Sequence, residues 1–367
     1  MNKSVLIIIP KLGSGGAERQ AVTVARLLAK VGCHVSFLTY FSGDFFKELL
    51  DEAGVHYMSE VCGGLKRIVM VRRKIKEGNY DVVISFMQTP NFLNNFAAIG
   101  KHSWKVISSI RATPQKEEFL SLQGRIYGWF YRISNVIVTN SQNTSNVFSS
   151  FFPRYQSKLS TIYNAVQLGE IKSNYIAKIN NRLNVVVAAT ISKVKNPMGL
   201  LEALELMSEE EKALIHIDWY GKSESVIGDH SEYDKVIERI GKSNLGNVIS
   251  MPGESRSIAD IMYKADCVAL FSKREGLPNA ICEAMMIGKP IIMTKCSDFS
   301  VLVEENKNGF LCNWDEPASI KNALLKLAIL DKDDLIKMGD SSRDKAAKLF
   351  SQEAITKQWV TLINGNE

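Results

Sequence analysis

The sequence predicts an α/β protein of two doubly wound domains, each built on a parallel sheet. Short apolar runs, such as residues 5–9, 81–86 and 184–189, alternate with amphipathic segments of helical period. Runs that are apolar throughout are typical of parallel strands covered on both faces. A chain of 367 residues normally holds more than one domain. We expect a first domain over residues 1–170, a polar linker over 171–183, a second domain over 184–345 and a C-terminal helix over 346–367.

The composition is that of a globular protein, with 46% hydrophobic and 23% charged residues. The apolar run at residues 5–9 is too short for a signal peptide, and no run approaches the roughly 20 residues of a membrane span. The six cysteines are scattered without a Cys-x-x-Cys pair, and the histidines form no metal-spaced pair. We therefore expect reduced thiols, a cytoplasmic protein and no bound metal.

Charge is unevenly divided between the two halves. Residues 1–170 contain 20 Lys and Arg against 11 Asp and Glu, whereas the remainder contains 25 against 28. A basic first half fits an anionic membrane surface, a lipid-phosphate acceptor or nucleic acid, and it also fits a solvated surface without a partner. The charge alone does not choose among these.

An aromatic segment in the first half allows two structural interpretations. Residues 124–133 place four aromatic side chains between Arg125 and Arg132, and residues 65–77 form a basic helix. Interleaved aromatic and arginine side chains suit a membrane interface, where the rings lie at the headgroups. They equally suit a core helix with charged ends.

A glycine turn follows the first apolar run. Gly13, Gly15 and Gly16 lie between residues 5–9 and a helix that begins near Ala17. Strand, glycine turn and helix in this order are typical of a dinucleotide fingerprint, but Glu18 stands where Gly-x-Gly-x-x-Gly needs its third glycine. A nicotinamide-dependent oxidoreductase is therefore the weaker alternative.

The most informative stretch is residues 271–290, which contains two acids, Glu275 and Glu283. A buried strand over residues 267–271 leads through a turn into a helix expected from Asn279 to Ile287, which ends at Gly288. Glu275 lies in the turn and Glu283 within the apolar helix. Ligands of open parallel sheets bind where strands end, and helix N-termini there suit phosphates. Carboxylates accept hydrogen bonds from hydroxyls, so the combination predicts a sugar-nucleotide site.

This stretch resembles the signature of the retaining glycosyltransferases of family 4. The pattern Glu-Gly-x-Pro-Asn-x-x-x-Glu-Ala-Met-x-x-Gly-x-Pro is matched at Glu275, Gly276, Pro278, Asn279, Glu283, Ala284, Met285, Gly288 and Pro290. Gly-Gly-Ala-Glu at residues 15–18 resembles the first loop of these enzymes. Residues 190–196 resemble their Gly-Arg-Leu-x-x-x-Lys-Asn segment, with Lys195 on the lysine and Thr190 in place of the arginine.

The resemblance implies a GT-B enzyme, with two domains facing a cleft and the last helix packing on the first domain. It implies transfer of a hexose or N-acetylhexosamine with retention, by same-face substitution, from a nucleoside-diphosphate sugar, expected to be a UDP-sugar. The acceptor would be a glycan or lipid-linked oligosaccharide of bacterial surface polysaccharide, with no nucleic acid partner. The enzyme would be cytoplasmic or peripheral on the inner face of the membrane, without metal or other cofactor.

The same resemblance assigns roles to single residues. Lys195 would neutralise the leaving diphosphate, Glu283 would bind the ribose and Glu275 the transferred sugar. Arg111, at a strand end of the first domain, would contact the donor phosphate or the acceptor. The remaining donor-binding candidates are Gly15, Gly16, Thr190, Lys193, Gly276, Leu277, Pro278 and Asn279. The alternative within this fold is a membrane-associated partner without catalytic activity.

Overall fold

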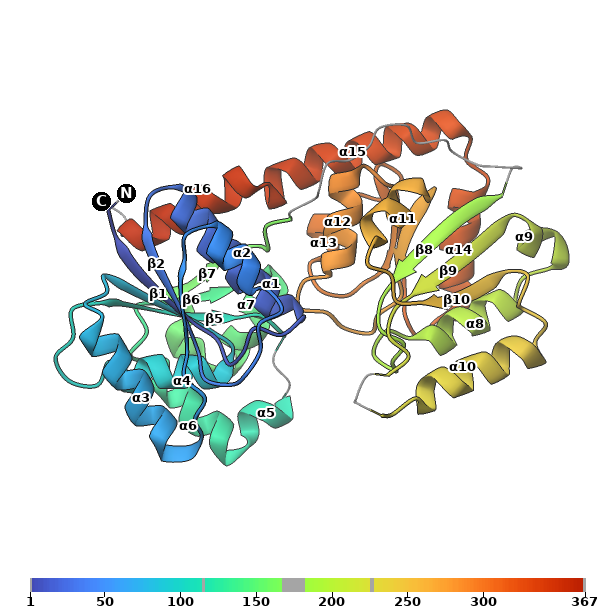
Figure 1. Cartoon of the computed structure of the whole chain (residues 1–367). Helices are drawn as coiled ribbons and strands as arrows, with labels where there is room; N and C mark the ends of the chain where they lie inside the picture. Colours follow the sequence, from blue (N-terminus) through green and yellow to red (C-terminus); the bar gives the residue numbers. More distant parts are fainter. Residues whose placement is uncertain (1, 114–115, 167–181, 225–227, 366–367) are drawn as a thin grey trace. The chain divides into compact units, whose positions relative to one another are not determined.

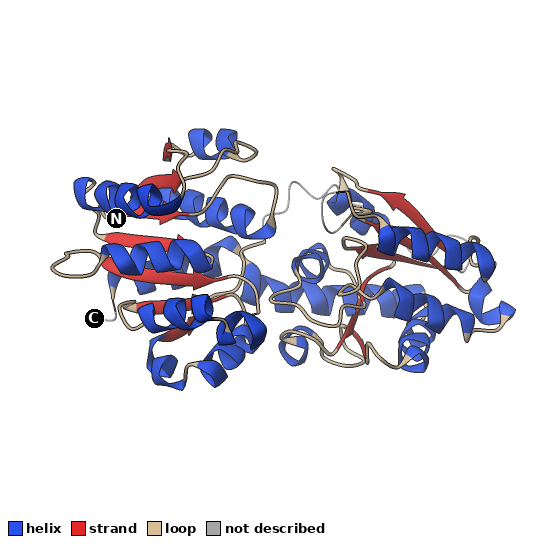
Figure 2. Ribbon diagram, turned by 90° about the horizontal axis from the view of Figure 1, so that it is seen from below, coloured by secondary structure: helices blue, strands red, loops and turns tan. Residues whose placement is uncertain are grey.

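The computed structural model describes residues 2–113, 116–166, 182–224 and 228–365. The chain forms two compact units, one of Met1–Ala165 with Gln352–Glu367 and one of Val166–Ser351. Each holds a parallel sheet with helices on both sides, as Figure 2 shows. The predicted pair of doubly wound, Rossmann-like folds is therefore confirmed.

The first unit contains a seven-stranded sheet of order β3-β2-β1-β4-β5-β6-β7, and every pairing in it is parallel. Its strands are β1 (Ser4–Ile8), β2 (His34–Thr39), β3 (His56–Ser59), β4 (Val82–Phe86), β5 (Lys105–Ile110), β6 (Val136–Thr139) and β7 (Leu159–Thr161). The chain builds outward from β1 in one direction and then returns to continue with β4 in the other. The topological switch point of this sheet therefore lies between β1 and β4.

Alternate side chains of the strands pack into two separate hydrophobic cores, one on each face of this sheet. Val5 and Ile7 of β1 pack on one face with α1 (Gly16–Lys30), α2 (Lys47–Glu52) and α16 (Gln352–Asn364). Leu6 and Ile8 pack on the other face with α3 (Gly64–Glu77) and α4 (Gln88–Ala97). That second face continues under α5 (Lys116–Leu120), α6 (Leu122–Phe130), α7 (Gln142–Phe151) and the short helix η1 (Pro153–Lys158).

The C-terminal helix belongs to the first unit. α16 packs against α1, and Ile355, Trp359 and Ile363 are buried in the same core as β1 (Figure 1). The return begins at Gln352 rather than at residue 346, because α15 (Lys332–Phe350) continues as one helix that packs on α12 (Asn279–Ile287) of the second unit.

The second unit contains a six-stranded parallel sheet of order β10-β9-β8-β11-β12-β13. Its strands are β8 (Leu183–Ala188), β9 (Ile215–Tyr220), β10 (Ile249–Gly253), β11 (Cys267–Leu270), β12 (Ile291–Thr294) and β13 (Gly309–Cys312). Its switch point lies between β8 and β11. Of the expected linker, residues 171–181 lie outside the described residues, and Leu183 already belongs to β8.

Two groups of helices cover this sheet. α8 (Pro197–Glu205), α10 (Ser231–Lys242) and α14 (Pro317–Ala328) pack together, and α11 (Ile258–Lys264), α12 (Asn279–Ile287) and α15 form the other group. The remaining helices are α9 (Glu209–Ala213) and α13 (Phe299–Leu302). Among the described residues, no helix combines the length and the apolar composition that a membrane span requires.

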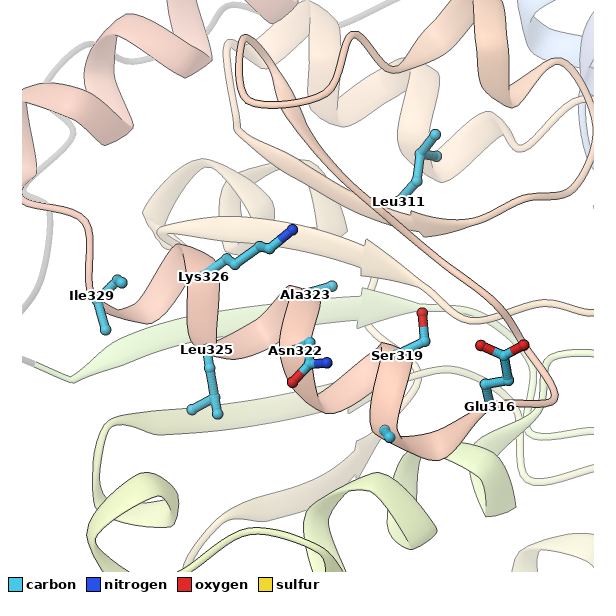
Figure 3. A pocket seen from close by; sticks show the side chains of 9 residues that line it. Leu311, Glu316, Ser319, Asn322, Ala323, Leu325, Lys326 and Ile329 are labelled. Atoms are coloured by element: carbon cyan, nitrogen blue, oxygen red, sulfur yellow. The ribbon is translucent and has the colours of Figure 1, made fainter.

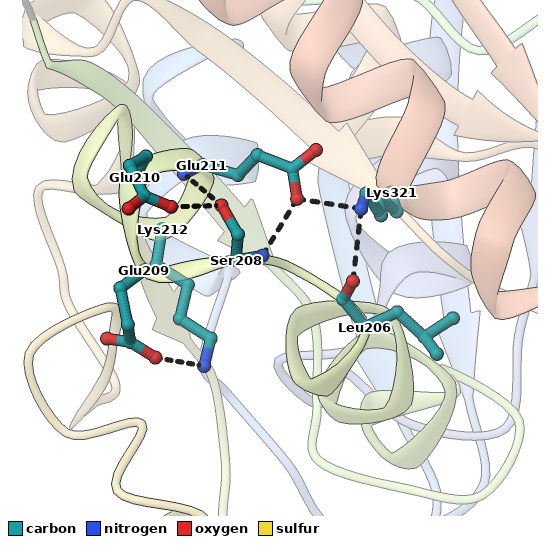
Figure 4. A network of polar contacts seen from close by, with 7 residues as sticks. All are labelled: Leu206, Ser208, Glu209, Glu210, Glu211, Lys212 and Lys321. Atoms are coloured by element: carbon teal, nitrogen blue, oxygen red, sulfur yellow. Dashed lines mark hydrogen bonds and ion pairs between the residues drawn. The ribbon is translucent and has the colours of Figure 1, made fainter.

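A capping network joins α9 to α14 (Figure 4). The hydroxyl of Ser208 accepts a hydrogen bond from the Glu211 backbone, and the Glu211 carboxylate accepts one from the Ser208 backbone. This reciprocal pair satisfies N–H groups that a helix start leaves without partners. Lys321 of α14 pairs with Glu211 at 2.7 Å and also donates to the Leu206 carbonyl at 3.0 Å. The contact fixes α14 beside the turn between α8 and α9.

Replacing Trp359 by alanine should destabilise the first unit. The side chain is fully buried against Phe86 of β4, with ring centres 6.4 Å apart. Removing it leaves a cavity, which costs about 3–5 kcal/mol of unfolding free energy. Urea unfolding followed by circular dichroism measures this, with Lys357→Ala at an exposed position of the same helix as control. Equal midpoints for the two variants would mean that α16 does not hold this core.

Candidate functional site

Two loops meet at the switch point of the second sheet. The loop after β8 and the loop after β11 are joined through their backbones, because the Lys273 N–H donates to the Val194 carbonyl at 2.8 Å. In the same two loops, Lys195 Nζ lies 2.5 Å from Glu275 Oε1. The two side chains are 26% and 13% exposed, so this ion pair is partly shielded from water. The structure thus brings together the cation and the acid that the sequence singled out.

The loops after β12 and β13 hold the first two in place. The hydroxyl of Ser297 donates to the Gly276 carbonyl, and that of Thr294 donates to the Ser272 carbonyl, both at 2.5 Å. The Asn196 amide donates to the Trp314 carbonyl at 2.8 Å. Four neighbouring strands therefore end in loops that bond to one another, which fixes the positions of Lys195 and Glu275.

Special backbone conformations permit these contacts. Asn196 and Ser297 both adopt the left-handed region, with φ of 62° and 54°, which costs a non-glycine residue free energy. Gly221, after β9, lies so close to the loop after β8 that a Cβ would be 1.9 Å from the Ala189 carbonyl oxygen. Sequence reasoning missed Asn196, Ser297 and Trp314 as positioning residues. Only Asn196 carried a usable signal, since asparagine tolerates the left-handed region better than other residues.

Helix α12 begins at this same edge of the sheet. It spans Asn279–Ile287, as predicted, and ends at Gly288 with φ of 83°. Asn279 and Glu283 lie four residues apart on its one partly exposed face, while Ile281, Cys282, Ala284 and Met285 are buried. The start of the helix follows Gly276, Leu277 and Pro278, so its N-terminal N–H groups and positive end lie next to the loop that carries Glu275.

The other candidates of the second unit occupy the loop after β8. Thr190 is half-buried and Lys193 is exposed. The loop is held on its other side by the Ile191 N–H, which donates to the Lys222 carbonyl at 2.9 Å. Lys195 is thus the cation of this loop that contacts an acid of the β11 loop, and Lys193 is the more solvated one.

The first unit has a pocket at its own switch point. It has a volume of about 360 Å³ and lies between Pro10, which follows β1, and Met87, which follows β4. Its lining is mainly apolar and also includes Ala17, Gln88, Thr89, Pro90, Ile110, Arg111, Ala112, Phe119 and Tyr131. Gly15 and Gly16 stand at the N-terminus of α1, directly before Ala17. Met87 has φ of 81° and ψ of 165°, a region normally restricted to glycine and concentrated at functional sites.

Arg111 has partners of its own in this unit. It donates to the Ile162 carbonyl and the Asn164 side chain, and its guanidinium lies over the Phe86 ring at 4.9 Å and the Trp359 ring at 5.9 Å. Burial lowers the pKa of the guanidinium to about 9, so it stays charged at neutral pH. Arg111 therefore links the end of β5 to α16, and its contact with a substrate stays a prediction.

A shallow hollow lies along α14 in the second unit (Figure 3). Two of its polar side chains have partners within the unit: Asn313 donates to Glu316, and the Ser319 hydroxyl accepts from the Asn313 backbone. Lys326 lies over the Phe310 ring. Because Glu316, Ser319 and Lys326 have these partners within the unit, the hollow is a weaker candidate for substrate binding than the switch point.

No metal cluster occurs in the part of the chain that the structure describes, where no three His, Cys, Asp or Glu side chains gather closely enough to hold an ion. All six cysteines are unpaired. Near the site, burial is the main reason that the pKa of Cys296 rises to about 11, with the charge of Glu275 adding to the rise. Its thiol is therefore protonated at neutral pH.

Two Rossmann-like units, the second with a lysine–glutamate pair and a helix N-terminus at its switch point, define the GT-B class of glycosyltransferases. The family models agree with this assignment. Residues 14–170 match the model for Glycosyltransferase Family 4, and residues 171–345 match that for Glycosyl transferases group 1. The chain belongs to this glycosyltransferase family. The oxidoreductase alternative is therefore wrong.

Known proteins are similar to this chain over all or part of its length. An α-1,4-N-acetyl-D-galactosaminyltransferase of Campylobacter jejuni, named for a GalNAc-containing undecaprenol diphosphate substrate, is 23% identical and covers 98% of both chains. The Escherichia coli protein WcaL, a putative colanic acid biosynthesis glycosyltransferase by name, is 30% identical over 49% of this chain and 45% of its own length. Anabaena HepE, solved with UDP and glucose, has a TM-score of 0.82, is 19% identical and covers 99% of this chain and all of its own.

Replacing Asn196 by alanine should loosen the loop network. The change leaves the Trp314 carbonyl without its donor and puts alanine in the left-handed region, and together these effects cost about 2–4 kcal/mol of unfolding free energy. Asn196→Gly should recover part of the loss, because glycine adopts this conformation freely. Asn322→Ala, at an exposed position of α14, is the matched control.

Thermal unfolding of the three variants measures the order of stabilities. If Asn196→Ala and Asn322→Ala had the same melting temperature, the hydrogen bond to Trp314 would contribute nothing to the stability of the second unit.

Proposed function

We propose that the protein is a retaining glycosyltransferase that moves a sugar from UDP to a lipid-linked oligosaccharide or glycan acceptor in bacterial surface polysaccharide synthesis. The observation that carries the proposal is the contact between Lys195 and Glu275 across the switch point. A nucleoside-diphosphate sugar offers an anion for the lysine and hydroxyls for the carboxylate, so one donor would engage both side chains.

The diphosphate is the group that needs most stabilisation in this reaction. Its negative charge grows as the bond to the sugar breaks. Lys195 and the N-terminal N–H groups of α12 would stabilise that charge. Lys193 would add a weaker, solvated charge, since Thr190 brings none. Because these groups supply positive charge, we propose that transfer needs no metal ion or other cofactor.

The two carboxylates would hold the sugars of the donor. Glu283 lies one turn into α12 beside Asn279 and would accept hydrogen bonds from the ribose hydroxyls. Glu275, directly before Gly276 and Leu277, would accept hydrogen bonds from hydroxyls of the transferred sugar. With this arrangement the acceptor hydroxyl would attack from the face that the diphosphate leaves, and the leaving phosphate would take its proton.

The acceptor would bind in the first unit. The pocket between the ends of β1 and β4 has a largely apolar lining, which suits the apolar faces of sugar rings, while Gln88, Thr89 and Arg111 offer hydrogen-bond donors. The named substrate of the Campylobacter relative supports a lipid-linked acceptor, and an N-acetylhexosamine as the transferred sugar. The UDP complexes of HepE support the choice of UDP.

A donor screen with an anomeric assay tests the proposal. We expect one UDP-sugar to raise the melting temperature, transfer to give product with the donor's anomeric configuration by NMR, and activity to persist in EDTA. Glu283→Gln should weaken donor binding about tenfold or more, because ribose hydroxyls lose a charged acceptor. Glu238→Gln, on exposed α10, is the control.

Inverted product would contradict retention, and loss of activity in EDTA would contradict metal independence. Binding of a UDP-sugar without transfer to any acceptor would favour the non-catalytic partner instead.

A further inference from the structure

Helix α6 exposes an apolar stripe. Leu122, Ile126 and Trp129 are 77%, 44% and 43% exposed. Their spacing of four and three residues puts them along one face of the helix. A surface helix normally turns such a face toward the core, so a stripe left outside is a feature that a partner would explain.

The other faces of α6 already form the core contacts of the helix. Tyr127 stacks on Phe92 of α4 with ring centres 4.6 Å apart, and Phe130 meets the same ring edge-on at 4.9 Å. Gly128 is buried so closely against Phe152 that a Cβ would lie 2.3 Å from that ring. The aromatic segment thus divides: Tyr127 and Phe130 are packing residues, whereas Trp129 is turned outward.

The surroundings of the stripe are basic. Residues 119–166 contain four Arg or Lys and no Asp or Glu. Arg125 is exposed on α6, next to Trp129 in the helical period, and the Arg132 guanidinium lies 3.5 Å from the centre of the Trp129 ring. The nearest acid along the chain whose side chain is described is Glu117 on α5. The exposed apolar side chains are therefore flanked by positive charge.

Helix α3 also exposes apolar side chains. α3 and α6 both pack against α4, on the same face of the sheet (Figure 1). Leu65 and Val69 of α3 lie one turn apart and are 80% and 67% exposed, with exposed Lys66 between them in sequence. Arg72, another cation of α3, is engaged within the protein, because it donates to the carbonyls of Phe96 and Ile99 at the end of α4.

We propose that this docking face, formed by Leu122, Arg125, Ile126, Trp129 and Arg132 with Leu65, Lys66 and Val69, binds the surface of an anionic lipid bilayer. Apolar side chains beside arginines match the two layers of such a surface, the acyl boundary and the phosphate headgroups. Trp129 is suited to the boundary itself, because its ring is apolar and its N–H is polar. The inference goes beyond donor and acceptor binding and uses no residue of the candidate site.

Charge argues against a second copy of the chain as the occupant. A twofold interface sets the same patch against itself, so Arg125 and Arg132 of both copies would be brought together without an acid on the face to pair with them. Anionic headgroups remove this repulsion.

Co-sedimentation of the full chain with lipid vesicles tests the proposal. We expect binding to vesicles of phosphatidylglycerol with phosphatidylcholine, little binding to phosphatidylcholine alone, and weakening by salt. Leu122→Ser with Ile126→Ser, and separately Arg125→Glu, should each lower the partition coefficient about fivefold or more. Ile329→Ser and Lys332→Glu, at exposed positions of the second unit, are matched controls and should bind like the unaltered protein.

Three results would overturn the proposal: no binding to anionic vesicles, equal binding by docking-face and control variants, or a dimer that only the docking-face variants lose. Circular dichroism verifies folding, and Arg125→Glu tests the face by a charge reversal at an exposed position. The thermal shift with UDP is measured on the same variants and should be unchanged. If the protein failed to bind lipid but still responded to UDP, only the docking face would be contradicted. If it bound lipid but did not respond to UDP, only the proposed function would be contradicted.

Discussion

The ion pair between Lys195 and Glu275 is the constraint around which the second unit is organised. Each residue lies just beyond a strand, one on either side of the switch point, and they meet only because β8 and β11 are neighbours in the sheet. An ion pair this shielded costs desolvation, which its attraction offsets only with good geometry. We propose that a diphosphate would replace the carboxylate as the partner of the lysine, and that the pair would hold the cation in position before this anionic substrate binds.

The surrounding loops explain why the geometry is good. Bonds from Ser297 to Gly276, from Asn196 to Trp314 and from Lys273 to Val194 join four loops at one edge of the sheet. Two of these residues adopt left-handed backbone conformations that cost free energy locally. The bonds that the conformations permit offset that cost. The hydrogen bonds between the loops therefore fix the backbone positions from which the side chains of Lys195 and Glu275 extend.

The sequence predicted the elements around the candidate site, because each depends on a local pattern, and the family resemblance singled out its charged residues. Apolar runs fixed the strands, and the motif from Glu275 to Pro290 fixed α12. The sequence could not predict the positioning roles of Ser297 and Trp314, because these depend on contacts between loops far apart in the chain. Nor could it predict the pocket beside Met87, because that pocket includes a backbone conformation that methionine rarely adopts. Nor could the pattern of residues 124–133 show which aromatic side chains face α4 and which face outward. That division depends on how closely Gly128 approaches Phe152.

A double-mutant cycle on UDP binding tests the central claim most directly. Calorimetry would compare the unaltered protein, Lys195→Met, Glu275→Gln and the double variant, with Lys295→Met, an exposed lysine after β12, as control. We predict that Lys195→Met weakens binding about tenfold or more, and that Glu275→Gln tightens it more when Lys195 is present than when it is absent, by at least about 1 kcal/mol of coupling. Unchanged affinity in Lys195→Met, or effects that simply add, would contradict the claim that diphosphate and carboxylate compete for one lysine.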